Sequence, residues 1–361
     1  MKTSKSEGRY GTTKHFKVCS VLPPFMLESI AFNSSGTAAA AARSTLLSTA
    51  RLSGQRDRAP MRTAMASPGP KQRVVYDARN AERLPGVLML HEGSLPSSDV
   101  AIAEAYNGAG LTYDMLLESF GRNSLDGQGL RLDSTVKYGR SYLNAFWNGN
   151  QMVYGDGDGK LFNRFTICPD ICGHELWHGH TQYCSNLQYQ DQSGALNESL
   201  SDCFGTMVKQ RLLGQTADKA DWAIGVELLT DRVQGHGIRN LLNPGTAYDD
   251  PILGKDPQPA SMDDYLGGDE DSGQVHGNSG IPNRAFAVAA VSAGGFTIEK
   301  IGKVWYTAAT RYLTYSSDFS DMAAGTIAIS GQLFGVGGDV EHAVRAGWDK
   351  VKVKTSVLRV G

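Results

Sequence analysis

The sequence predicts an α+β fold in which a strand-rich lobe precedes a mainly helical lobe. Short runs rich in β-branched and aromatic residues, together with a hairpin signal, lie before about residue 165. From about residue 166 the apolar residues recur at helical spacing instead. A chain of 361 residues is long enough for both lobes, predicted at 74–170 and 171–361, and for an N-terminal segment that belongs to neither.

The strands of the first lobe are predicted from local composition. Residues 73–76 and 87–90 have the composition of strands. The runs 144–147 and 151–154 flank Asn148-Gly149-Asn150, and this favours a hairpin because Asn-Gly adopts positive φ at little cost.

Helices are predicted where apolar residues follow a period of 3.6. One covers about 99–120 and is headed by two capping candidates, Ser98 and Asp99. The second lobe contains further helical patterns, at 285–293, 298–313 and 318–334.

The N-terminal part divides into two zones. Residues 1–32 end in an apolar cluster in which an extended Pro23-Pro24 pair leads into a short helix. Residues 33–73 are rich in Ala, Ser, Gly and Arg and contain a single acidic residue, Asp57. Because such a composition buries little surface, we expect 33–73 to be a mobile linker.

Composition and charge restrict the function classes. Hydrophobic residues make up 41% and charged residues 20%, and the net charge of −2 gives no reason to expect nucleic acid or an anionic membrane as partner. No run is apolar for long enough to span a bilayer, and the first twenty residues have no apolar core of a Sec signal peptide. We therefore expect a monomer made in the cytoplasm, with release by a non-classical route left open. The cysteines form no disulfide framework and are expected to be small reduced core residues: Cys19, Cys168, Cys172, Cys184 and Cys203.

A metal-ligand pattern lies at the start of the helical lobe. His174 and His178 are four residues apart, so on a helix both imidazoles project from one face toward a single ion. Glu175 lies close enough to act on a water bound to that ion. Alone, the pattern is weak evidence, because a pair of helical histidines is often only a partly exposed face.

The downstream sequence strengthens the metal interpretation. Glu198 can complete a His₂Glu ligand set that leaves an open position for water. Asp202, one turn later, can accept the second ring N–H of a zinc histidine. The alternative, a solvated helix face, is difficult to maintain because the two acids are surrounded by apolar residues: Leu196, Leu200, Cys203 and Phe204.

Three segments resemble the thermolysin-type (M4) metallopeptidases. They are HELWHGHTQYCSNLQYQDQSGALNESLSDCFGTMV, NAFWNGNQMVYGDGDG and DSGQVHGNSGIPNRAF, and the similarity runs from about residue 73 to the C-terminal helices. The resemblance implies a two-lobed zincin with an active-site cleft between the lobes. It also implies one catalytic zinc, bound by His174, His178 and Glu198, and a general base, Glu175, that activates the zinc-bound water.

The same resemblance implies the remaining catalytic roles. Tyr189 and His276 would donate hydrogen bonds to the oxyanion of the tetrahedral intermediate. Asp271 would orient His276 and keep it protonated. Without the family frame, Tyr189 would be interpreted as a core aromatic residue and His276 as a loop histidine near acids.

Substrate contacts are also implied by the resemblance. Arg239 would bind a substrate carbonyl on the primed side, and Asn144 with Ala145 would pair with the substrate backbone as an edge strand. A preference for a bulky hydrophobic residue after the cleaved bond follows from the pocket residues, which are otherwise interpreted as plain core: Phe162, Ile171, Ile224 and Ile238.

One part of the pattern departs from thermolysin. Asp170 and Asp221 match acids of a double-calcium site, but several other liganding positions carry residues that cannot fill that role. Calcium binding is therefore doubtful, because one of the residues at these positions is a lysine, which would repel the ion. The substituted positions are Lys209, Ala223, Val226 and His236.

The leader resembles the compact propeptide of the protealysin subgroup through Pro23, Pro24, Phe25 and Leu27. This implies an inhibitory propeptide at 1–32 and a maturation site within 33–73. Cys19 could in principle bind zinc in the precursor, although the Pro-Pro motif offers a docking element without it.

The function predicted from these features is a zymogen of a zinc endopeptidase. Its partners would be a peptide or protein substrate and its own propeptide, and cleavage would occur on the N-terminal side of bulky hydrophobic residues. One alternative is a degenerate protease fold that acts as a peptide-binding or regulatory module. Another is a toxin that acts on one defined protein.

Overall fold

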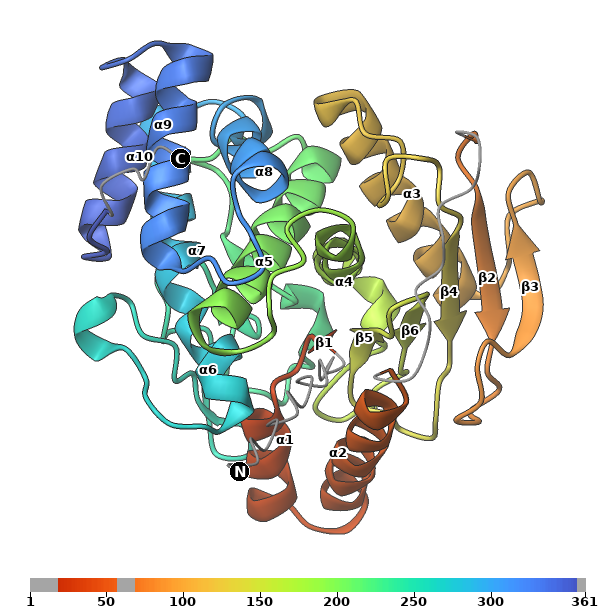
Figure 1. Cartoon of the computed structure of the whole chain (residues 1–361). Coiled ribbons are helices and arrows are strands. Elements are labelled where there is room, and N and C mark those ends of the chain that lie inside the picture. Colours follow the sequence, from red (N-terminus) through yellow and green to blue (C-terminus); the bar gives the residue numbers. More distant parts are fainter. Residues whose placement is uncertain (1–18, 57–68, 356–361) are drawn as a thin grey trace, which may run out of the picture.

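The computed structural model describes residues 19–56 and 69–355. The signal-peptide analysis, which concerns residues 1–20, falls almost entirely outside this range, as does the part of the predicted linker at 57–68. Figure 1 shows the sheet of residues 73–154 on one side of the molecule, with the helix of residues 100–120 beside it. The helices after residue 270 lie on the other side, and the helix of residues 169–182 lies between them. The predicted order of a strand-rich lobe and a helical lobe is confirmed.

The strand-rich lobe is built on a six-stranded sheet with the order β1-β5-β6-β4-β2-β3. The pairs β6–β4 and β4–β2 are parallel, and the other pairs are antiparallel. The strands are β1 (Cys19–Ser20), β2 (Arg73–Asp77), β3 (Val87–His91), β4 (Leu132–Val136), β5 (Ala145–Trp147) and β6 (Met152–Tyr154). The outermost position beside β5 is therefore occupied by the N-terminal segment.

The predicted hairpin is the pair β5–β6. Gly149 has a φ of 98°, and the Asn148 carboxamide oxygen accepts hydrogen bonds from the backbone N–H groups of Asn150 and Gln151 at 2.9 Å each. The turn therefore uses the left-handed freedom of glycine and a local side-chain bond, as Asn-Gly predicts. It matters for the site because it fixes β5 as an edge to which another strand can add.

The helical lobe contains the elements predicted from periodicity, together with shorter two-stranded sheets. Its helices are α4 (Pro169–Gln182), α5 (Asp191–Leu213), α6 (Asp271–Asn278), α7 (Gly280–Ala293), α8 (Ile301–Arg311), α9 (Phe319–Phe334) and α10 (Asp339–Lys350). Helix α3 (Val100–Phe120) belongs to the first lobe, where it packs on β2 and β4. The small strands are β7 (Ala223–Ile224), β8 (Arg239–Asn240), β9 (Asp249–Asp250) and β10 (Gly254–Lys255). Of the two capping candidates for α3, Asp99 is the cap, because its carboxylate accepts from the N–H groups of Ala101 and Ile102.

The expectation of a mobile linker is wrong for residues 36–56. This stretch forms a helix, α2 (Gly36–Arg56), which packs beside α1 (Pro24–Asn33). Consecutive alanines have the highest helix propensity, and their small side chains let a helix approach its neighbour closely. Ala39 and Ala42 are buried, and the Thr45 hydroxyl accepts a hydrogen bond from the Leu143 N–H at 2.9 Å.

Glycines allow α4 and α5 to pack closely. A Cβ on Gly205 would lie 2.4 Å from the Asp170 carbonyl oxygen, and one on Gly173 would lie 2.9 Å from Val208. No larger side chain fits at either position without movement of the backbone. This close approach brings the side chains of α4 and α5 together at the centre of the molecule.

Candidate metal centre and active site

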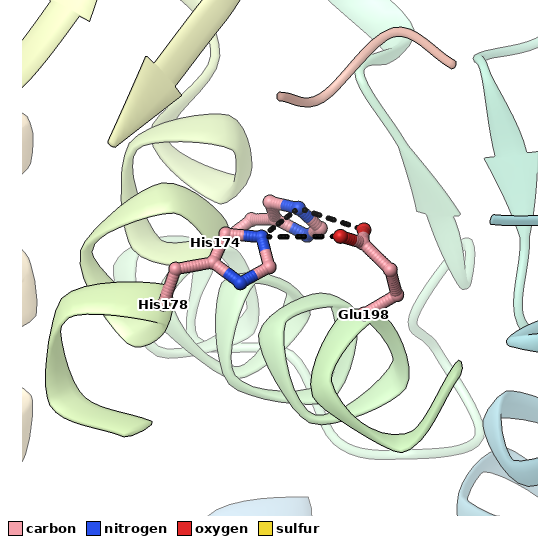
Figure 2. A group of neighbouring side chains, drawn as sticks. All are labelled: His174, His178 and Glu198. Carbon is pink, nitrogen blue, oxygen red and sulfur yellow. Dashed lines mark hydrogen bonds and ion pairs between the residues drawn. The ribbon is translucent and has the colours of Figure 1, made fainter. Parts of the chain in front are cut away.

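Three buried side chains from α4 and α5 converge on one point (Figure 2). The Nε2 atoms of His174 and His178 are 3.2 Å apart, and each lies 3.4 Å from an oxygen of Glu198. All three ligand atoms lie within 4.8 Å of one another. Because two imidazoles and a carboxylate are the donor set that zinc prefers, the predicted triad fits that ion.

The outer ring nitrogens of both histidines are held by hydrogen bonds. His174 Nδ1 donates to Asp202 at 2.8 Å, as predicted, and His178 Nδ1 donates to the Asn197 carboxamide oxygen at 2.9 Å. With the proton on Nδ1, the lone pair of each Nε2 faces the shared point. Glu198 Oε2 is buried and accepts no hydrogen bond within the described chain, as expected of an oxygen that is a metal ligand.

Glu175 lies on the same helix, next to the triad. Its Oε2 accepts from the Trp147 backbone N–H at 2.9 Å, whereas Oε1 is buried and has no partner among the described residues. Burial, assisted by Glu198, raises the pKa of Glu175 to about 8 although His174 opposes the shift. A bound cation would lower this pKa again.

His276 and Tyr189 lie beside the Glu198 carboxylate. His276 Nδ1 donates to Asp271 at 2.9 Å, and the Tyr189 hydroxyl donates to Glu198 and lies 3.4 Å from His276 Nε2. Burial lowers the pKa of His276, but the charges of Asp271 and Glu198 outweigh it and raise that pKa to about 9. The raised pKa favours a protonated His276, whose Nδ1 donates to Asp271.

The start of α6 places Asp271 against His276. Asp271, Ser272, Gly273 and Gln274 all have positive φ, between 48° and 82°. Such a left-handed run is costly for residues with a Cβ and is found where the surrounding structure imposes it. It turns the Asp271 carboxylate back onto both the backbone N–H and Nδ1 of His276.

The predicted substrate-binding residues hold the N-terminal segment. Arg239 Nη1 donates to the Val21 carbonyl oxygen at 2.8 Å, and its Nε and Nη2 donate to Asp202 at 2.7 and 2.8 Å. Asn144 makes two hydrogen bonds with the backbone of Leu22, at 2.9 and 3.0 Å. The segment therefore lies where Arg239 and Asn144 would contact a peptide.

The predicted pocket residues form part of one buried apolar cluster that also includes Val21 and Leu22. A Cβ on Gly225 would lie 3.3–3.4 Å from Ile238 and Ile171, so these two side chains share one small space. All four predicted residues are at most 2% exposed: Phe162, Ile171, Ile224 and Ile238.

Sequence reasoning missed several polar residues of the site. Asn197 and Ser201 bond the outer nitrogen of His178, and Asn283 donates to Asp202 at 2.9 Å. Asn197 and Ser201 lie within one turn of Glu198 and could have been found from helical spacing. Asn283 is 81 residues from Asp202, and no local pattern indicates the contact.

Lys209 lies between two acids, Asp170 and Asp221, that match the double-calcium site of thermolysin in the sequence. Its ammonium lies 3.3 Å from Asp170 and 2.9 Å from Asp221, and it donates to the Ala223 carbonyl. Burial lowers the pKa of Lys209, but the two carboxylates outweigh this and raise it. The lysine is therefore charged and only 2% exposed.

The site defines a zinc metallopeptidase. One helix carries two ligand histidines and an adjacent glutamate, the next helix supplies the third ligand, and an edge strand lies beside them. Two family models match this chain: "Thermolysin metallopeptidase, catalytic domain" at residues 71–182 and "Thermolysin metallopeptidase, alpha-helical domain" at 185–353. The chain belongs to the thermolysin metallopeptidase family and is a zinc metalloendopeptidase.

Individual relatives agree with this assignment. The "Extracellular metalloprotease" of Pectobacterium carotovorum subsp. carotovorum is 47% identical over 338 residues, which are 93% of this chain and 97% of the relative. A "Thermolysin" of Alicyclobacillus acidocaldarius subsp. acidocaldarius is 38% identical over 290 residues, 77% of this chain and 50% of that one.

A solved structure extends the similarity to the leader. The precursor of protealysin, a metalloproteinase from Serratia proteamaculans, has 48% identity and a TM-score of 0.85, and covers 93% of this chain and 99% of its own. The part of this chain that aligns with the precursor is longer than the region that the two family models match. The similarity therefore extends into the N-terminal segment. The chain is the zymogen form of a thermolysin-like peptidase, as the sequence predicts.

Within the described residues, no helix is both long enough and apolar enough to cross a membrane.

Proposed function

We propose that the mature enzyme cuts peptides on the N-terminal side of bulky hydrophobic residues, with Glu175 as general base. The observation that carries this proposal is the placement of Glu175 Oε1, buried and unpaired among the described residues, beside the triad of His174, His178 and Glu198. The runner-up, a degenerate peptide-binding module, would not need to retain Glu175, Tyr189 and His276 in one site.

The zinc ion that His174, His178 and Glu198 would bind supplies a Lewis acid. Glu175 takes a proton from the attacking water and passes it to the nitrogen of the leaving amine. His276 and Tyr189 donate hydrogen bonds to the carbonyl oxygen as negative charge develops on it.

Substrate specificity follows from two groups of contacts. Arg239 and Asn144 bind the backbone of the residues after the cleaved bond, which fixes their position but not their identity. The apolar residues around Ile171 and Ile238 would bind the first side chain after the bond. Because a charged side chain cannot be hydrated there, it would be excluded.

Specificity is tested with two fluorogenic peptides that differ only in the residue after the central bond. A peptide with Leu at that position is expected to be cleaved about 10² times faster or more than one with Asp, since burial of an unpaired carboxylate costs several kcal/mol. Cleavage products are identified by mass spectrometry. Equal rates, or cleavage elsewhere in both peptides, would contradict the proposed pocket.

We also propose that residues 1–56 act as the inhibitory propeptide and that maturation cuts the chain between Arg56 and Gly69. The helix α2 protects the residues before this interval, because a protease needs an extended backbone. The Gly69 carbonyl and Lys71 are bound to the catalytic body, by Asn123 and Asp114. The interval proposed for the maturation cut is therefore narrower than the interval predicted from composition, residues 33–73.

The place of action is proposed from a relative. The Pectobacterium protein is named an extracellular metalloprotease, and we propose that this enzyme also acts outside the cell that makes it. The route of release and the monomeric state remain predictions.

We propose that the Lys209 ammonium takes the place of a calcium ion. It neutralises Asp170, whose carboxylate is fully buried, and it bridges to Asp221 at the surface. A dication beside a buried ammonium would be repelled.

Lys209→Met is expected to lower the free energy of unfolding by about 3–5 kcal/mol, because it leaves the Asp170 carboxylate buried without its partner. Denaturant unfolding of the precursor measures the change. Lys219→Met is the matched control, because that lysine and its partner Asp218 are both exposed, and solvent screens such an ion pair. A calcium-selective chelator should leave the wild-type curve unchanged. If the chelator lowered the free energy of unfolding of the wild type as much as Lys209→Met does, calcium would be shown to be bound.

A further inference from the structure

The N-terminal segment binds in the cleft through its backbone, as an added strand. β1 pairs antiparallel with β5 at the edge of the sheet (Figure 1). After β1, the Val21 N–H donates to the Ala145 carbonyl at 3.1 Å, and Leu22 exchanges two hydrogen bonds with the Asn144 side chain. These backbone contacts place each residue of the segment at a definite position relative to the triad.

Two carbonyl groups of the segment identify the register. The Ser20 carbonyl accepts from His276 Nε2 at 3.0 Å, and the next carbonyl, that of Val21, accepts from Arg239 at 2.8 Å. In the proposed mechanism His276 bonds the carbonyl of the bond that is cut, and Arg239 bonds a carbonyl on its far side. The bond in the cleavage position is therefore Ser20–Val21.

The side chain after this bond fits the proposed specificity. Val21 is apolar and completely buried, and its carbonyl is bound by Arg239, the residue that follows Ile238 in the chain. A cavity of about 450 Å³ borders the segment and is lined in part by Ser20, Tyr189 and His276.

We propose that Ser20–Val21 is the first bond that this enzyme hydrolyses, within its own chain, and that the remaining segment stays bound as a product-like inhibitor. The proposal rests on the proposed function. Water adds its hydroxyl to the Ser20 carbonyl carbon and the C–N bond breaks. The proton accepted by Glu175 goes to the Val21 nitrogen, leaving a Ser20 carboxylate and a Val21 amine.

The remaining segment stays bound because its anchors lie after the cleaved bond. They include the hydrogen bond between Val21 and Arg239 and the two hydrogen bonds between Leu22 and Asn144. Helix α1 adds the buried Met26, Leu27 and Ile30, and α2 adds the bond of Thr45 to Leu143. Since α2 is still joined to β2 through the chain, the new amino terminus remains at high effective concentration in the cleft.

Activation therefore requires two cuts with different consequences. The first, at Ser20–Val21, leaves the primed side of the cleft filled by Val21 and Leu22. The second, between Arg56 and Gly69, removes the tether and lets the segment dissociate. Activity toward other peptides should follow the second cut only.

Intact-mass measurement on purified zinc-loaded precursor tests this order. A species that begins at Val21 should form before any species that begins after Arg56. Its first-order rate constant should stay the same over a tenfold dilution, because the reaction is intramolecular. Hydrolysis of a fluorogenic peptide, followed in parallel, should rise only with the later species.

Two variants of the segment form a matched pair. Val21→Asp places a carboxylate in the apolar pocket and should slow the first cut by about 10² or more. Phe32→Asp makes the same kind of change at a side chain that is 89% exposed, on the last turn of α1, and should leave the cut unchanged. Equal slowing by both would show that the register is not the cause.

A binding measurement tests the inhibitor without any catalysis. Peptides of residues 19–30 and 21–30 are titrated calorimetrically into Glu175→Ala protein from which a second protease has removed the N-terminal segment. Their dissociation constants should agree within about 10²-fold, since the shorter peptide loses only the bond of the Ser20 carbonyl to His276 and the two-residue pairing with β5. Failure of the shorter peptide to bind would refute the product-like inhibitor.

The outcomes separate this inference from the proposed function. If the mature enzyme cleaves the Leu peptide but no chain ever begins at Val21, the inference is overturned and the proposed function stands. If the mature enzyme cleaves no peptide at all, the proposed function fails first.

Discussion

Removal of zinc is expected to abolish peptide cleavage by the mature enzyme. The ion would be held by three ligands that are at most 2% exposed, and a Lewis acid at this position is worth several kcal/mol of transition-state stabilisation, or about 10³ in rate and more. Treatment with 1,10-phenanthroline should bring hydrolysis of a fluorogenic peptide to background, and added zinc should restore it.

Metal analysis accompanies the assay. Purified protein should contain about one zinc per chain, and the loss of activity should follow the loss of zinc in a titration of the chelator. A calcium-selective chelator is the control and should leave the rate unchanged. Full activity in protein that contains no transition metal would exclude the proposed mechanism.

Zinc removal is also expected to lower the stability of the fold. Without a cation, the Glu198 carboxylate stays buried with one oxygen that accepts no hydrogen bond from the described residues, while the Nε2 atoms of His174 and His178 face each other at 3.2 Å. An ion that binds only the folded state stabilises it by mass action. The melting temperature should therefore rise with zinc concentration.

The metal triad could be predicted from the sequence because its geometry is local. His174 and His178 are related by one helical turn, and Glu198 and Asp202 by another, so spacing alone places each pair on one face. The sequence does not show how closely α4 and α5 approach. That depends on Gly173 and Gly205, whose role becomes clear only when both helices are in place.

The contacts of the N-terminal segment could not be predicted in the same way. Ser20 and His276 are 256 residues apart, and Val21 and Arg239 are 218 apart. The sequence emphasised Pro23 and Pro24, whereas the backbone contacts with the cleft are made by the residues just before them. Pro24 instead opens α1, a position that suits proline because the first N–H groups of a helix have no internal partner.

Composition was misleading for α2 for a physical reason. Low apolar content argues against a core of large side chains, and on that basis 33–73 was expected to be mobile. Alanine helices can be buried by close approach instead, with hydroxyls supplying bonds to the partner. Thr45 with Leu143 and Thr49 with Tyr142 provide such bonds here.

Glu175→Ala is expected to lower kcat/KM of the mature enzyme by about 10²–10⁴, the usual contribution of a general base. All three zinc ligands remain, so zinc content should equal that of the wild type. Glu175→Gln tests the charge separately, because its amide oxygen can still accept from the Trp147 N–H that Glu175 Oε2 binds at 2.9 Å. Glu118→Gln, at an exposed pair with Arg211, is the control and should keep full activity.

The same substitution should stop self-processing. Wild-type precursor is expected to mature to a form that begins between Arg56 and Gly69, whereas Glu175→Ala and Glu175→Gln stay full length when no other protease is present. Because the base is removed but the segment still binds the cleft, the variants should melt at a temperature close to that of wild-type precursor. Intact-mass measurement over time decides between the outcomes. Maturation of pure Glu175→Ala at the wild-type rate would show that another mechanism cuts the chain, and a full-length form as active as the trimmed one would show that residues 19–56 do not inhibit.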